Sequence, residues 1–102
     1  MTSTDVETRS IEARAATFRA LSDPIRLSIL DLLQPGERCV CDLQEALDVA
    51  SNLLSYHLRI LREAGLVAST RRGRWVDYRL ADDAAATVEA ALPSSPIDDA
   101  AQ

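Results

Sequence analysis

The feature that most constrains the fold is a change of hydrophobic period at Gly65. Before Gly65, apolar residues recur at the three- and four-residue spacing of helices; after it, two short segments alternate as strands do. We therefore predict helices over residues 8–21, 24–33, 42–47, 51–64 and 82–92, and a β-hairpin over 66–80 with its turn at 71–74. This order, four helices, two strands and a closing helix, predicts a mainly α fold with one β-hairpin (α+β).

Local signals mark several of these boundaries. Asp23 and Pro24 suit the N-cap and first position of a helix, and residues 34–36 (QPG) end it. Gly65 suits the left-handed position after a helix.

With 102 residues the chain has room for one domain. We expect a flexible start at residues 1–8, a folded domain at 9–92 and a disordered tail, rich in Pro and small or acidic residues, at 93–102.

The distribution of charge points to a polyanionic partner. The net charge is −5, every basic residue is Arg, and six of the eleven arginines fall between residues 51 and 80. Only Glu63 and Asp77 oppose them in that window. A basic region in an acidic body is typical of a DNA-binding face.

Helices 42–47 and 51–64, followed by a basic hairpin, predict a winged helix-turn-helix. A helix fits the major groove, and the hairpin brings positive charge to nearby phosphates or to the minor groove. Leu54, Leu58 and Leu61 form an apolar stripe that we expect to face the core. The expected DNA-contacting residues are Ser51, Asn52, Ser55, Tyr56, His57, Arg59, Arg71, Arg72 and Arg74. We expect His57 either to contact DNA or to brace the turn between the two helices. The alternative is an amphipathic helix beside a charged, solvated hairpin.

Cys39 and Cys41 form a Cys-x-Cys pair at a predicted helix start. No apolar run is long enough to span a bilayer and no secretory signal is seen, so we expect a cytoplasmic protein with reduced thiols and no membrane partner. The helix start and Arg38 favour thiolates, and two thiolates can chelate one soft ion. The alternative is that both cysteines are small buried apolar residues.

Several segments resemble one family. Residues 20–30 (ALSDPIRLSIL) are similar to the ALSDPTRLRIL signature of ArsR/SmtB repressors, as are residues 39–43 (CVCDL), 55–67 and 73–78. The resemblance covers residues 14–82. It implies a homodimeric winged helix that represses its own operon when free of inducer. Pairing with a second copy would also add core to so short a chain. We therefore expect a double-stranded operator that is an imperfect palindrome.

The Cys-Val-Cys-Asp-Leu run resembles the inducer site of the arsenic-responsive members, which hold As(III) or Sb(III). Those members have a third Cys where this chain has Gln44, so the resemblance implies two thiolates completed by water or an exogenous thiol. Members that bind cadmium or lead use cysteines nearer the N-terminus, and zinc members use Asp and His on the last helix. This chain has no Cys before Cys39 and no His on its last predicted helix. The expected inducer is therefore As(III) or Sb(III), with no permanent cofactor.

Three alternatives remain. The thiols could sense oxidants or another thiophilic metal, or have no effector. The chain could be a thiol enzyme. Its one His lies on the predicted helix 51–64 and leaves no general base beside the thiols, so we expect that the protein is not an enzyme. It could also be an interaction module that does not bind DNA, against which the hairpin arginines argue.

Overall fold

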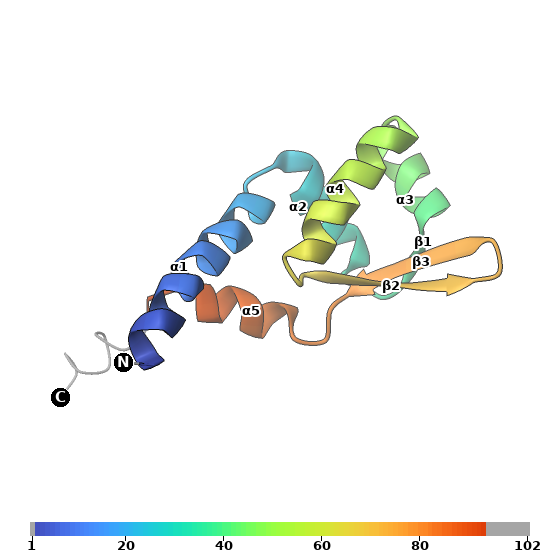
Figure 1. The fold of residues 1–102 in the computed structure, drawn as a ribbon. Coiled ribbons are helices and arrows are strands. Elements are labelled where there is room, and N and C mark those ends of the chain that lie inside the picture. Colours follow the sequence, from blue (N-terminus) through green and yellow to red (C-terminus); the bar gives the residue numbers. More distant parts are fainter. Residues whose placement is uncertain (1, 94–102) are drawn as a thin grey trace.

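The computed structural model describes the backbone of residues 2–93 and the side chains of residues 11–93. Its elements are α1 (Thr2–Leu21), α2 (Pro24–Leu33), β1 (Arg38–Cys39), α3 (Val40–Leu47), α4 (Ser51–Glu63), β2 (Val67–Arg72), β3 (Trp75–Leu80) and α5 (Ala84–Ala91). The helices α2, α3 and α4 lie over the sheet, while α1 runs beside α5 at the end away from the hairpin (Figure 1). The predicted mainly α fold with a hairpin is confirmed.

Three helix starts differ from the prediction and one strand was missed: α3 begins at Val40 rather than residue 42, and α5 at Ala84 rather than residue 82. Helix α1 begins at Thr2 rather than near residue 8, because no Gly or Pro interrupts residues 2–21. The flexibility expected of residues 1–8 stays a prediction, and Met1 and residues 94–102 of the expected tail lie outside the described residues. Strand β1 has two residues, too few to show a period, so the sequence predicted only the hairpin.

The start of α2 follows the sequence prediction. The Asp23 carboxylate accepts hydrogen bonds from the backbone N–H groups of Ile25 (2.8 Å) and Arg26 (3.2 Å), and Pro24 opens the helix. Partial burial works to raise the pKa of Asp23. The hydrogen bonds from Arg26 and Ile25 outweigh it and hold the pKa below its ordinary value. Asp23 is therefore an ionised N-cap that fixes where α2 begins.

The sheet has three antiparallel strands in the order β1-β3-β2. Cys39 pairs with Asp77 in one ladder, and Arg72 pairs with Trp75 in the other. The turn is therefore tighter than predicted, with only Gly73 and Arg74 between the strands. Gly73 has φ +62°, which a residue without a side chain adopts without strain.

The core joins the helices to the base of the sheet. The predicted stripe of α4 is confirmed, since Leu54, Leu58 and Leu61 are at most 1% exposed. They pack with Leu43 of α3 and residues of the other elements in one cluster. The apolar side of α4 is thereby anchored, which leaves its other side exposed. None of the described helices is long and apolar enough to cross a membrane.

Candidate nucleic-acid interface and thiol site

Helix α4 presents a continuous polar face. Ser51, Asn52, Ser55, Tyr56 and Arg59, all predicted to contact DNA, are exposed. A shallow groove of about 500 Å³ runs between α4 and β3, lined by Asn52, Ser55, Tyr56, Arg59, Arg62 and Tyr78. The sequence prediction missed Arg62, although its three-residue spacing from Arg59 places both on one helix face. This face can offer amide, hydroxyl and guanidinium groups to base edges and phosphates.

His57 is not part of that face. Its side chain is 5% exposed, and its Nδ1 lies 2.8 Å from a guanidinium nitrogen of Arg26. Because arginine only donates, Nδ1 accepts this hydrogen bond. The expected DNA contact by His57 is therefore wrong: the ring lies on the core side of α4 and braces the helix instead.

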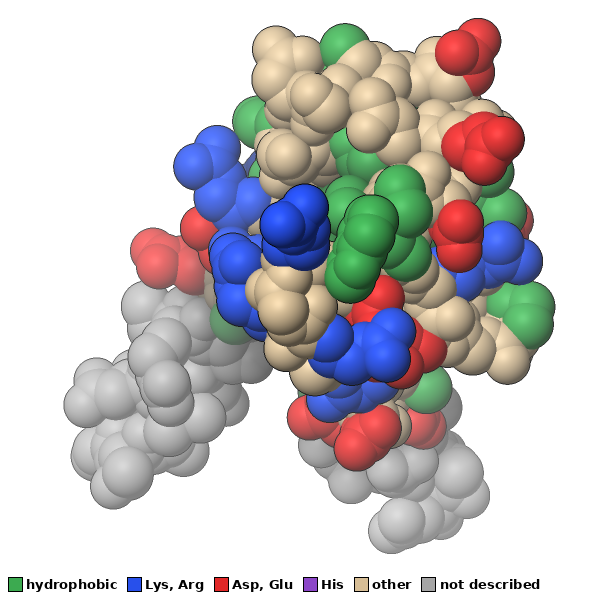
Figure 2. All heavy atoms as spheres, turned by 90° about the vertical axis from the view of Figure 1, so that its right-hand side faces the viewer, with side chains coloured by type: hydrophobic (Ala, Val, Ile, Leu, Met, Phe, Trp, Pro, Cys, Tyr) green, Lys and Arg blue, Asp and Glu red, His purple; other side chains and the backbone are tan. Residues whose placement is uncertain are grey.

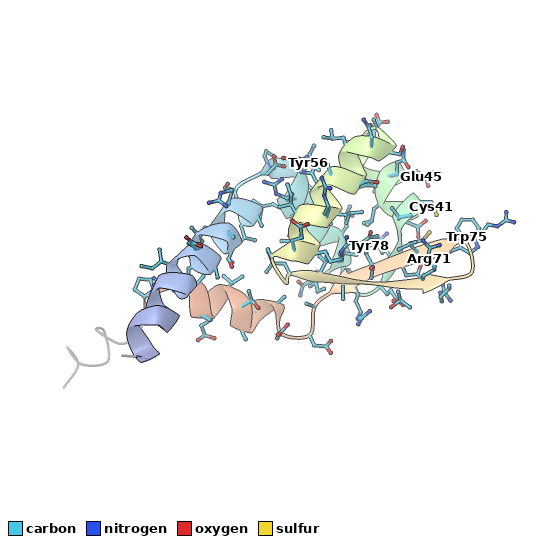
Figure 3. The ribbon with its side chains drawn as sticks, viewed as in Figure 1. Cys41, Glu45, Tyr56, Arg71, Trp75 and Tyr78 are labelled. Atoms are coloured by element: carbon cyan, nitrogen blue, oxygen red, sulfur yellow. The ribbon has the colours of Figure 1, made fainter. Side chains whose placement is uncertain are left out.

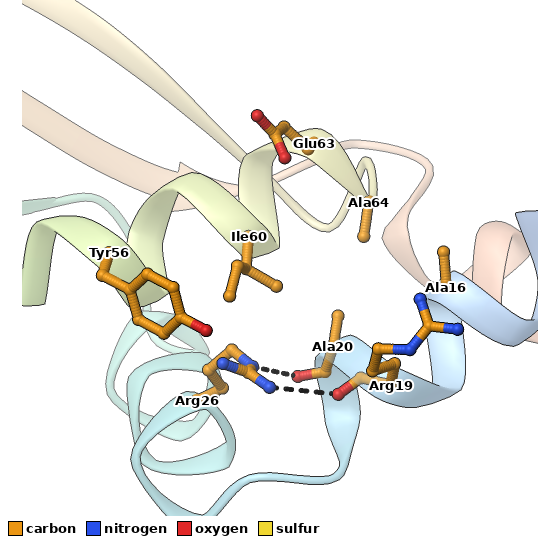
Figure 4. A pocket seen from close by; sticks show the side chains of 8 residues that line it. All are labelled: Ala16, Arg19, Ala20, Arg26, Tyr56, Ile60, Glu63 and Ala64. Carbon is orange, nitrogen blue, oxygen red and sulfur yellow. Dashed lines mark hydrogen bonds between the residues drawn. The ribbon is translucent and has the colours of Figure 1, made fainter.

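Arg26, which the sequence prediction also missed, connects three helices. It is 7% exposed, and its guanidinium donates to the carbonyl oxygens of Ala20 (2.8 Å) and Arg19 (3.1 Å) at the end of α1. Figure 4 shows these two bonds below the side chain of Tyr56. The sequence signal was one Arg in the apolar segment 24–33. Its burial between α1 and His57 fixes α4 relative to the rest of the domain.

A pocket of about 380 Å³ lies beside this contact, between α1 and α4 (Figure 4). Its walls are mostly small or apolar, and Arg19 and Glu63 lie at its polar side. Across this space the side chain of Arg26 links the two helices, because it bonds both the end of α1 and His57 of α4.

The hairpin carries the predicted arginines at its end. Arg71, Arg72 and Arg74 are all exposed. Figure 2, which faces the hairpin end, shows basic side chains gathered around an exposed apolar group. Trp75, which the sequence prediction did not assign to the interface, is 56% exposed at the start of β3. The wing, as residues 71–75 are called below, is thus a cationic tip with one large aromatic side chain.

One wing arginine has an ion pair. An Arg72 guanidinium nitrogen lies 2.7 Å from the Asp77 carboxylate, with the Arg72 side chain 71% and the Asp77 side chain 6% exposed. Asp77, one of the two acids in the basic window 51–80, therefore neutralises part of the charge of Arg72. Arg72 lies opposite Trp75, and Asp77 follows two residues along β3 on the same face of the sheet.

The two thiols lie against each other. Cys39 is the N-cap of α3, with extended backbone angles (φ −68°, ψ 147°), and its sulfur accepts a hydrogen bond from the Cys41 N–H at 3.4 Å. The two sulfur atoms are 2.7 Å apart, and Cys41, near the hairpin in Figure 3, is exposed. Side chains two apart within a helix do not face each other, but these two do because Cys39 precedes the helix.

The protonation of this pair also differs from expectation. The hydrogen bond shared with Cys39 raises the pKa of the Cys41 thiol, as do partial burial and the neighbouring Cys39 and Asp42. The expected lowering by the helix start is therefore wrong for Cys41. Cys41 therefore favours its thiol form.

The donor set around the thiols is small. Among residues 11–93, no group of three or more His, Cys, Asp or Glu side chains is placed to hold a metal ion. Gln44, at the position where the resembling members have a third Cys, donates its side-chain amide to the Val49 carbonyl oxygen at 3.3 Å. Two soft sulfur donors suit a thiophilic ligand whose remaining position is filled from solution.

Comparison with known proteins agrees with this geometry. Residues 23–69 match the family model described as bacterial regulatory protein, arsR family. The repressor SmtB of Mycobacterium tuberculosis (strain H37Rv) is 46% identical over 72 residues, 71% of this chain and 53% of that protein. The arsenical resistance operon repressor of Escherichia coli (strain K12) is 50% identical over 64 residues, 62% of this chain and 55% of that protein. The chain spans about half the length of these curated relatives.

Among solved structures, the transcriptional repressor BigR from Xylella fastidiosa superposes with a TM-score of 0.66 at 33% identity. The match covers 89% of this chain and 90% of that one. The likeness thus extends beyond the helix-turn-helix to the hairpin and the outer helices.

Proposed function

The chain belongs to the arsR family of bacterial regulatory proteins, and from that premise we propose that it is a transcriptional repressor released from its operator by As(III) or Sb(III). The observation that carries the proposal is an exposed polar α4 beside an arginine-tipped wing, together with a pair of facing thiols at the start of α3. The relatives named as arsenical resistance operon repressors support the choice of inducer.

DNA binding follows from the exposed surface. In the proposal, α4 enters the major groove, where Ser51, Asn52, Ser55, Tyr56 and Arg59 reach base edges and phosphates. The wing supplies Arg71, Arg72 and Arg74 to the flanking phosphates or minor groove. Arg62 extends the basic face of α4 toward the sheet.

We propose a homodimer through α1 and α5. Ile11 (59%), Phe18 (41%) and Leu92 (47%) are exposed apolar side chains on or next to these helices. A groove of about 230 Å³ between the helices is lined mostly by alanines and threonines, which allow close helix approach. A second copy would cover these residues and would place two α4 helices on an imperfect palindrome with half-sites about one helical turn apart. Sedimentation at micromolar concentration tests this assembly.

A thiol at Cys41 is compatible with arsenite in particular. Arsenous acid is neutral, and each As–S bond forms as a thiol proton and an arsenic-bound hydroxide leave together as water. Arsenite can therefore bind without a net release of protons, whereas Zn²⁺ or Cd²⁺ must displace the protons of both thiols. The third arsenic position stays with hydroxide or an exogenous thiol.

Ligand binding acts where helix and sheet meet. Chelation sets the separation of the two sulfurs by the bond lengths and angles of the ligand, and it ties Cys39, at the end of β1, to Cys41 in α3. Because the two sulfurs already face each other, binding does not require the first turn of α3 to unwind. The constraint instead falls on the junction of β1 and α3.

A titration tests the proposal. A labelled fragment from upstream of the chain's own gene should bind the protein, and arsenite and antimonite should release it at lower concentrations than cadmium or zinc. Fluorescence anisotropy at fixed salt measures the release. If cadmium or zinc acts first, the assigned inducer is wrong; if the fragment never binds, the proposed operator is wrong.

The facing sulfurs favour one second candidate, a repressor that senses oxidants through the same two thiols. Peroxide would take two electrons and two protons from the pair and give a disulfide and water. A Cys-x-Cys disulfide closes a small, strained ring, which argues against this candidate. Mass spectrometry after peroxide treatment separates the two: loss of two hydrogens with release of DNA would support the redox function.

A further inference from the structure

Strand β1 connects the thiol pair to the wing. Cys39 is the last residue of β1 and pairs with Asp77 of β3, and β3 continues without interruption to the wing at Trp75. Figure 1 shows β1 beside β3 at the foot of α3. Partners across an antiparallel ladder have side chains on one face, about 5 Å apart at Cβ. Cys39 and Asp77 are therefore neighbours, although 38 positions separate them in the sequence.

Asp77 is also the residue that holds Arg72. It is 4% exposed, and its carboxylate lies 2.7 Å from the Arg72 guanidinium. A buried carboxylate is costly unless it is paired, so Asp77 restrains an arginine that would otherwise move freely at the surface. Arg72 has five N–H donors, and this contact leaves several of them free for a phosphate.

We infer that Asp77 is a positioning residue that couples the thiol pair to the DNA-binding wing, by holding Arg72 in the orientation that meets DNA. The inference rests on the proposed function. When a ligand binds both sulfurs, it ties Cys39 to Cys41 in the geometry of the ligand, and the pairing of Cys39 with Asp77 is disturbed because β1 has only two residues. Asp77 then no longer fixes Arg72, and the wing loses an oriented phosphate contact.

The experiment measures operator affinity with and without arsenite. In the wild type we expect arsenite to weaken binding by about 5- to 150-fold, the usual range of such coupling. We call the ratio of operator affinities without and with arsenite the arsenite factor. In Asp77→Asn this ratio should be no more than about 2. Arsenite binding itself, counted as thiols lost to a colorimetric reagent, should not change. A merely structural role for Asp77 would alter affinity or melting temperature and leave the arsenite factor intact.

Arg71→Gln is the matched control. Arg71 is an exposed neighbour of Arg72 on the same strand, so its loss should weaken operator binding while the arsenite factor stays at the wild-type value. Should Asp77→Asn fail to fold, Asp77→Thr takes its place, because threonine suits a strand and also carries no carboxylate. This variant should also lose the arsenite factor.

A wild-type arsenite factor in any folded Asp77 variant would overturn the inference and leave the proposed function standing. A wild-type protein whose thiols bind arsenite without any loss of operator affinity would overturn both.

Discussion

Arg26 shows how much of the site depends on a single buried cation. Its guanidinium bonds two carbonyl oxygens of α1 and the ring of His57 in α4, so α4 is oriented from its buried side. The sequence showed an Arg in an apolar helix, and nothing in the pattern said that its side chain would be buried. The same missing information led to His57 being assigned to DNA, because spacing along a helix does not show what packs over it.

Arg26→Met should therefore lower both stability and DNA binding. It removes three hydrogen bonds to a buried charged group and leaves the acceptors unpaired, so we expect a loss of about 2–4 kcal/mol in the free energy of unfolding. Operator affinity should fall even where the variant is fully folded, because α4 is less firmly oriented. Denaturant unfolding and anisotropy measure the two effects. Arg62→Met, at an exposed position, is the control for stability and should change it by less than about 0.5 kcal/mol.

The Asp23 cap gives a pH dependence with a definite sign. Because its pKa is lowered in the folded state, the ionised carboxylate stabilises α2 above the ordinary pKa of 3.8, and this contribution is lost as the pH falls through the lowered value. Asp23→Asn keeps an acceptor oxygen but no charge. Its melting temperature should therefore lie below that of the wild type at neutral pH and approach it in acid. A gap that widens on acidification would contradict the assigned cap.

Among the helices and strands, the elements predicted best are those whose pattern of apolar residues extends over many positions. Helix α4 and the Gly65 turn follow from apolar spacing and glycine, and the hairpin follows from alternation. Strand β1 could not be predicted, since its two residues are held by β3, 38 positions away. The Arg72–Asp77 pair was missed because it depends on strand register, which the assumed four-residue turn gave incorrectly.

The register has a measurable consequence for the wing. Arg74→Ala should flatten the dependence of log affinity on log salt by about one unit, the value for one lost phosphate contact. Arg72→Ala should flatten it less, because Asp77 already neutralises part of the Arg72 charge. Binding isotherms at several salt concentrations, on operator and on unrelated DNA, provide the slopes. Equal slopes for both variants and the wild type would remove the wing from the interface.

For the domain as a whole, the arrangement matters more than the net charge of −5. Five of the eleven arginines lie on α4 and the wing, and Cys39 of the thiol pair lies opposite Asp77 on β3, the strand that leads to the wing. In the proposed function, sensing and DNA binding are thus joined through β1 and β3. The central claim is that Cys39 and Cys41 together receive the inducer and that neither is needed for DNA binding.

That claim is tested most directly by measuring arsenite-induced release of operator DNA from Cys39→Ser and Cys41→Ser beside the wild type. Serine keeps the size and the capping capacity of cysteine but supplies no soft sulfur, so both variants should bind DNA nearly as the wild type does. Neither should be released at the arsenite concentration that frees the wild type, since each lacks one donor of the pair. If either single variant is still released at that concentration, the sensing site lies elsewhere and the account is contradicted.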